Sequence, residues 1–163
     1  MQKMIRVLAI IAVILVAFSM LALLVSIPLQ RVLATKIFNY PAEMVAYLPI
    51  VPFPQLLRCL LLLGCAILVM VCAGKKGIIL PEILLLIVLL FVIPGVNNFL
   101  PTLIANWLAR TKGEMYVAAN SVANTVSNFC TTPAALGNSL ALVVCGMNMV
   151  YKKMSKQLDK LTP

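Results

Sequence analysis

The stretch VLAIIAVILVAFSMLALLVSIP, from Val7 to Pro28, is 22 residues long and carries no charge. A hydrocarbon core about 30 Å thick needs roughly 20 apolar helical residues to cross it. Three further apolar stretches follow along the chain, so we expect four transmembrane helices at about residues 5–27, 55–73, 78–94 and 133–151. The predicted fold class is an all-α integral membrane protein that forms one four-span domain over residues 1–163.

The composition agrees with this fold class. The chain is 63% hydrophobic and 10% charged, whereas a soluble domain is about 45–50% apolar and about a quarter charged. A net charge of +9 would suggest nucleic acid in a soluble protein, but the lysines and arginines lie mostly beside the ends of the predicted spans. We therefore expect no nucleic-acid partner. We expect anionic lipid headgroups near four lysines, namely Lys75, Lys76, Lys152 and Lys153.

The first long connection, residues 29–47, is predicted to be an interfacial helical segment on the outer membrane surface. Its apolar residues repeat at helical spacing, while prolines at positions 28 and 41 mark the expected ends of a first short helix. Pro41 and Glu43 then favour a second short helix, because proline and an acid both suit a first helical turn.

Residues 101–131 are predicted to be the second interfacial segment. Its first part places Trp107 on the apolar face of an amphipathic helix, a pattern typical of the bilayer interface. The sequence leaves open whether residues 114–132 lie on the membrane, dip into it or continue the fourth span.

The distribution of positive charge predicts the orientation. The side that carries both termini has the denser lysines and arginines, and loops rich in these residues stay in the cytoplasm. We therefore expect both termini to be cytoplasmic and the protein to lie in the plasma membrane. The first apolar stretch is longer than the roughly 7–15 residues of a signal-peptide core, which favours a retained first span over a cleaved one.

Glu82 is the one acid inside a predicted span. A carboxylate at the centre of a membrane helix costs up to roughly 3 kcal/mol, so such a residue is by default a candidate proton or solute site. The structural interpretation is favoured here. Glu82 follows Pro81 near the start of a helix, and from there it can reach Lys75 or Lys76.

A polar stripe in the second interfacial segment is the other candidate solute path. It comprises Asn120, Asn124, Ser127, Asn128 and Thr131, at helical spacings of i, i+4, i+7, i+8 and i+11. The stripe can line a water-filled path, face water on an interfacial helix, or form hydrogen bonds between helices. The structural interpretations are favoured.

Gly137, Ala141 and Cys145 are predicted to be a helix-packing face, because they lie four residues apart on the last span. Small residues at this spacing let helix backbones approach closely. They form either a homodimer contact or, as the favoured alternative, a contact between helices of one chain.

The sequence predicts no catalytic residue, metal site or cofactor. The chain has no histidine and four acids, and its five cysteines lack the CxxC spacing. We therefore expect a non-catalytic accessory, scaffolding or regulatory component that binds a membrane-protein partner or further copies of itself. The alternative is a small oligomeric transporter or channel that uses Glu82 and the stripe at 120–131. A thiol or lipid-modifying enzyme ranks third.

Overall fold

The computed structural model describes residues 2–46, 48, 52–73, 75 and 79–161, without the side chains of residues 114–115, 117–122 and 159–161. Every regular element in this part of the chain is helical. The segments long and apolar enough to cross a membrane are Gln2–Lys36, Phe53–Cys72, Leu80–Lys112 and Thr132–Leu158. The predicted all-α class with four such helices is confirmed, with boundaries that differ from the predicted ones.

Helix α1 (Gln2–Lys36) has a seam of buried residues spaced three or four apart. The seam consists of Ile5, Ala9, Ala12, Val16, Ser19, Leu23, Ser26, Gln30 and Ala34. This is the spacing with which one helix packs along another, and α1 packs mainly against α7 and α3. Its other faces expose many large apolar side chains.

The predicted break at Pro28 is wrong, because α1 continues through this proline to Lys36. An interior proline costs about 3 kcal/mol in a helix. Here Gln30 and Ala34, beyond the proline, remain buried, so continued packing of the seam offsets that cost. The predicted interfacial segment 29–47 is therefore the end of α1, a turn and the short helix α2 (Ala42–Val45), which begins after Pro41 as expected.

The third passage is also longer than predicted. Helix α4 (Leu80–Ile87), a π-helical turn (Val88–Val92) and α5 (Ile93–Lys112) follow one another without interruption, so the helix does not end at Pro94. The Ile93 N–H bonds to the Val88 carbonyl five residues earlier. Such a widened turn is a common way for a helix to absorb a local mismatch, here beside a proline that has no N–H.

Helix α6 (Glu114–Cys130) follows a reversal at Gly113, whose φ of 91° suits glycine. It packs against α5 and α1 and runs into α7 (Thr132–Leu161), with Thr131 between them. Residues 114–130 thus form a helix of their own, and the fourth helix long and apolar enough to cross a membrane begins at Thr132. The predicted segment 101–131 is not one element, because its first part belongs to α5 and its second part is α6, a separate helix that packs against α5 and α1. Its position at the membrane surface stays a prediction.

Helix α7 receives a cap from α1 at this junction. The Ser19 hydroxyl of α1 accepts a hydrogen bond of 2.7 Å from the Ala134 N–H, and both residues are fully buried. The first N–H groups of a helix have no partner within it, so a donor left unpaired here would be costly. The packing of α1 therefore allows α7 to begin inside the bundle.

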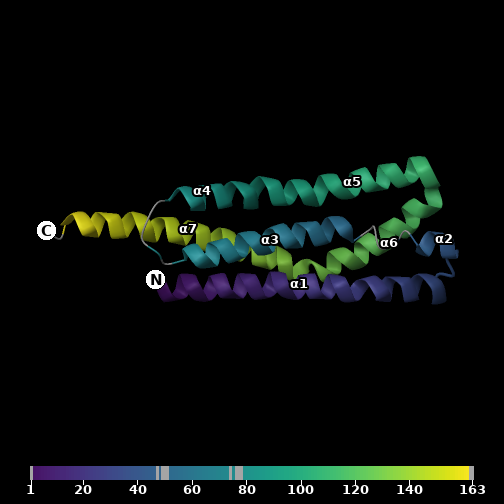
Figure 1. Ribbon diagram of the computed structural model, residues 1–163, viewed down its shortest axis with the longest axis horizontal. Coiled ribbons are helices and arrows are strands. Elements are labelled where there is room, and N and C mark those ends of the chain that lie inside the picture. Colours follow the sequence, from purple (N-terminus) through teal and green to yellow (C-terminus); the bar gives the residue numbers. More distant parts are fainter. Residues whose placement is uncertain (1, 47, 49–51, 74, 76–78, 162–163) are drawn as a thin grey trace.

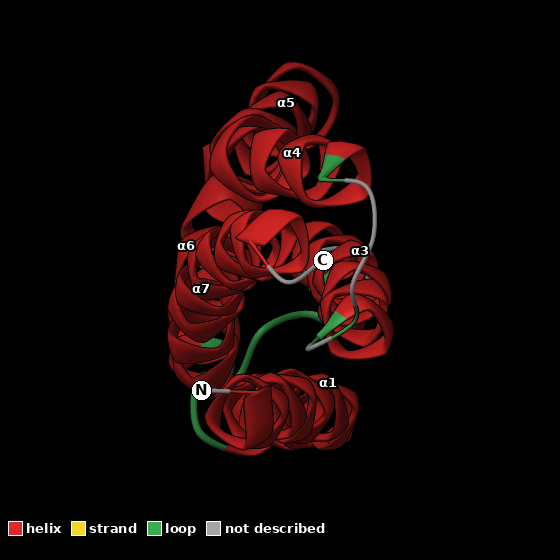
Figure 2. Ribbon diagram, turned by 90° about the vertical axis from the view of Figure 1, so that its left-hand side faces the viewer, coloured by secondary structure: helices red, strands yellow, loops and turns green. Residues whose placement is uncertain are grey.

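The helices form three layers. Figure 2 shows α3 and the α6–α7 passage between α1 on one side and α4–α5 on the other, which agrees with the contacts between these elements. Both termini lie at one end of the bundle, which we call the terminal end, and α2 lies at the opposite end, the α2 end (Figure 1). The last part of α7 projects beyond the other helices at the terminal end (Figure 1).

Candidate functional site

Glu82 lies at the terminal end and is 1% exposed. Its Oε1 accepts hydrogen bonds from Lys152 Nζ at 2.5 Å and from Asn148 Nδ2 at 2.8 Å. Asn148 Nδ2 also donates to the Cys72 carbonyl at 3.0 Å, so the group ties α4 to α7 and to the end of α3. We call Glu82, Asn148 and Lys152 the terminal-end cluster.

The predicted partner of Glu82 is wrong. Glu82 lies in the first turn of α4, as expected, but its ion pair is with Lys152, 70 residues later. Lys75 is exposed, and Lys76 lies outside the described residues. Lys152 is only 6% exposed, so its ammonium group is buried and not available to lipid headgroups. Lys153, by contrast, is exposed.

The polar stripe lies in the other half of the bundle. Ser127 is buried and accepts a hydrogen bond from Gln30 Nε2 of α1 at 3.2 Å. Asn128 Oδ1 accepts one from Gln55 Nε2 of α3 at 2.9 Å. Thr131 is buried and donates to the Asn128 carbonyl. The stripe thus bonds α6 to two other helices.

The remaining members of the stripe differ from these. Asn124 is half-buried, and its Oδ1 has no hydrogen-bond partner among the described residues. The Asn120 side chain lies outside the description. In the described part of the stripe, Ser127 and Asn128 therefore form hydrogen bonds to other helices, whereas Asn124 Oδ1 has no hydrogen-bond partner.

Arg58 extends this network to α5. Its Nη1 donates to Asn97 Oδ1 at 2.8 Å and, at a longer 3.4 Å, to Gln55 Oε1. An arginine one turn inside the start of a span is expected to extend toward lipid headgroups. Instead this guanidinium turns into the bundle. We call Gln30, Gln55, Arg58, Asn97, Ser127 and Asn128 the α2-end cluster.

Three members of this cluster were missed by sequence reasoning, namely Gln30, Gln55 and Asn97. A signal for Gln30 exists in the sequence. Ser19, Ser26 and Gln30 lie at the three- and four-residue spacing that also includes Ala9 and Ala12, which indicates one packed face of a helix.

The structure does not bring the two candidate sites together. The clusters lie at opposite ends of the bundle, and a core of apolar side chains lies between them. It includes Val16, Leu23, Leu62, Leu89 and Val144, all less than 1% exposed. Within the described residues, Glu82 and the stripe therefore do not line one path.

The small residues of α7 pack within the chain. A Cβ on Gly137 would lie 2.7 Å from Val16 Cγ2 and 3.1 Å from the Ala12 carbonyl oxygen, so α1 and α7 meet closely here. Ala141 and Cys145 are buried on the same side. All five cysteines are free, and the described residues contain no group of three or more metal-binding side chains.

Fold and site together define an all-helical bundle with four helices that could cross a membrane and two polar clusters that join these helices. Comparisons of the chain with protein-family models, with curated proteins and with solved structures give no match.

Proposed function

We propose that this chain is a multi-pass integral membrane protein that acts as a non-catalytic accessory, scaffolding or regulatory component. One observation carries the proposal. Polar side chains form two hydrogen-bonded clusters that join different helices, and buried apolar side chains lie between these clusters. Polar groups used in this way stabilise one arrangement of helices.

The separation of the clusters supports insertion in a bilayer. Arg6, which donates to the Ala73 carbonyl at the terminal end, and Gln30 are 24 residues apart on α1, or about 36 Å of helix. Gln55 and Cys72 are 17 residues apart on α3, or about 26 Å. These lengths bracket the roughly 30 Å of a hydrocarbon core. Each cluster then lies near one boundary of the membrane, where polar groups cost least.

The positive charges support the proposed orientation. Both termini lie at the end where Lys75 and Lys153 are exposed (Figure 1). With that end in the cytoplasm of a cell bounded by the plasma membrane, these lysines lie where anionic headgroups are available. The α2 end, with α2, the last turns of α5 and the start of α6, then extends beyond the outer leaflet.

A small transporter or channel is the second candidate. It is favoured by Glu82 Oε2 and Asn124 Oδ1, which are among the buried acceptors without a hydrogen-bond partner. Because these atoms lie in different halves of the bundle, a transport route needs either a second copy of the chain or a different conformation. We therefore rank this function below the first.

Two experiments separate the candidates. Affinity purification of the full chain in a mild detergent is expected to recover a partner in fixed stoichiometry, and an isolated monomer in every preparation contradicts an accessory role. Flux through vesicles that contain only the purified chain is expected to equal that of empty vesicles. A proton or solute flux that is abolished by Glu82→Gln establishes the transporter instead.

A further inference from the structure

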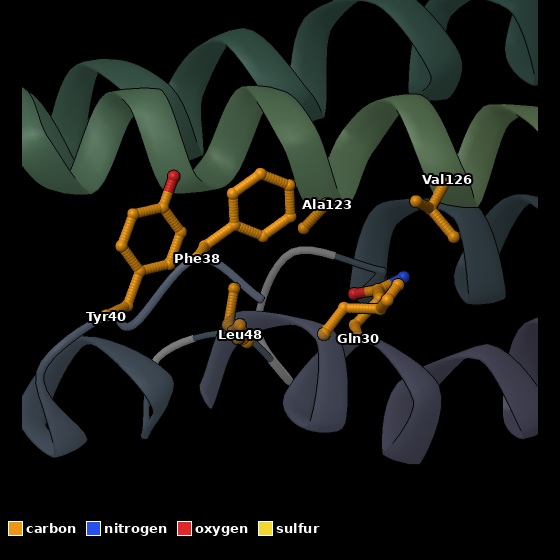
Figure 3. Close-up of a pocket in the computed structure, with 8 residues that line it drawn as sticks. Gln30, Phe38, Tyr40, Leu48, Ala123 and Val126 are labelled. Atoms are coloured by element: carbon orange, nitrogen blue, oxygen red, sulfur yellow. The ribbon is translucent and has the colours of Figure 1, made fainter. Parts of the chain in front are cut away.

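A small pocket lies at the α2 end, between α1 and α6. It encloses about 20 Å³ and is open on one side. Its walls are Leu33, Ala34, Phe38, Tyr40, Leu48, Ala123 and Val126, together with Gln30. Figure 3 shows Gln30 at one side of the pocket and the rings of Phe38 and Tyr40 at the other. These two rings stack, with centroids 5.6 Å apart.

The hydrogen bonds of Gln30 determine which atom of its amide is left without a partner beside the pocket. Its Nε2 donates to the hydroxyl oxygens of Ser26 and Ser127. Each of these serines already donates its own proton, Ser26 to the Leu23 carbonyl and Ser127 to the Ala123 carbonyl. The serines therefore accept from Gln30 and have no proton left for it. Its Oε1 is turned away from them and has no partner among the described residues.

An unpaired oxygen in this position favours a ligand. Gln30 is 4% exposed, and a buried acceptor without a donor costs about 1–3 kcal/mol. The pocket holds a group of about the size of one water molecule. A water molecule needs two to four polar partners. The side chains that line the pocket carry two polar groups, the Gln30 amide and the Tyr40 hydroxyl, and of these only Gln30 Oε1 is a buried atom without a partner. An alcohol with one hydroxyl group and a hydrocarbon chain suits a single unpaired acceptor beside apolar side chains better than a water molecule does.

The charges nearby favour an uncharged donor. Arg31 and Lys36 flank the segment of α1 that lines the pocket, and both are exposed. Their positive charge disfavours an ammonium group at Gln30. The oxygen itself is covered in this conformation, and Phe38 is the most exposed of the side chains that line the pocket, at 47%.

We propose that this pocket binds the hydroxyl group of an aliphatic alcohol, which donates to Gln30 Oε1 while its apolar body lies against Phe38 and Tyr40. The same chemistry is available from a free alcohol and from the glycerol headgroup of a lipid. The site is independent of the proposed function, because it uses no partner protein and no transport route.

The test uses octanol that carries a photoactivatable diazirine, with the full chain in vesicles of phosphatidylcholine and residue-level detection by mass spectrometry. Labelling is expected at Phe38, Tyr40 and Leu48. The matched octane diazirine, which lacks the hydroxyl, is expected to label the lipid-facing residues and to label the pocket about fivefold less, the effect of one hydrogen bond. Gln30→Leu is expected to bring the two probes to the same level at the pocket.

A second measurement uses the unaltered chain, so the proposal can still be tested if Gln30→Leu does not fold. Excess unlabelled octanol is expected to compete at the pocket, and excess octane is not. Vesicles that contain phosphatidylglycerol identify the source, since a fall in labelling assigns the site to a lipid headgroup and unchanged labelling to a free alcohol. Equal labelling by both probes in the unaltered chain, or no labelling at the pocket, overturns the proposal and leaves a site for water only.

Discussion

Gln55 and Asn128 are 73 residues apart in the chain, yet the Nε2 of the first donates to the Oδ1 of the second at 2.9 Å. This bond joins α3 to α6, in the half of the bundle where Arg58 joins α3 to α5. Two amides that neither charge nor hydropathy would single out therefore help to set the arrangement of three helices.

The Gln55–Asn128 bond is expected to show coupling in a double-mutant cycle. Gln55→Ala and Asn128→Ala each remove it, and the double variant is expected to be less destabilised than the two single losses added together. The coupling energy is expected to be about 0.6–1.7 kcal/mol, as for hydrogen bonds between membrane helices. The free energy of unfolding in detergent measures it. Asn106→Ala, at an exposed amide of α5, is the control and is expected to change little.

Removal of only one partner of the Glu82–Lys152 ion pair is expected to lower the stability of the fold more than removal of both charges. Lys152→Met leaves the carboxylate buried without its cation and is expected to destabilise the fold by about 3–5 kcal/mol. The double variant, with Glu82→Gln added, is expected to recover much of that loss because no unpaired charge remains. Thermal unfolding of both variants measures this. A double variant as unstable as Lys152→Met shows that the loss comes from packing and not from charge.

Two glycines of the same helix give a matched comparison. A Cβ at Gly137 would be 2.7 Å from Val16 Cγ2, whereas a Cβ at Gly146 has no atom within 4 Å. Gly137→Ala is therefore expected to destabilise the bundle by about 1–3 kcal/mol through overpacking. Gly146→Ala is expected to be neutral or to stabilise it by up to about 1 kcal/mol through helix propensity. Equal effects in an unfolding assay contradict the close approach of α1 and α7.

The proposed orientation predicts which ends an impermeant thiol reagent can reach. In a chain without its native cysteines, Lys112→Cys is expected to be labelled in intact cells. Lys75→Cys and Lys153→Cys, at the opposite end of the bundle, are expected to be labelled only after the cells are opened. Labelling of Lys153→Cys in intact cells reverses the orientation. Labelling of all three under both conditions contradicts a sealed membrane topology.

The helix boundaries were predicted least well, and for a physical reason. Pro28 and Pro94 predicted ends because proline removes a backbone donor. In the structure both lie in continuous helical runs, since tertiary contacts on either side outweigh that local cost. At Pro41, where no long helix packs across the position, the local signal agrees with the observed start of α2.

The sequence by itself determined that the chain forms four long apolar helices, because hydropathy compares each residue with its solvent and needs no knowledge of neighbours. It also singled out Glu82 and the stripe as polar groups that require partners. Only the tertiary structure decided that these partners are Lys152, Asn148, Gln30 and Gln55. Which polar groups meet depends on how helices that are distant in sequence pack and rotate against one another. Hydropathy does not distinguish between these packings, because every span is similarly apolar in all of them.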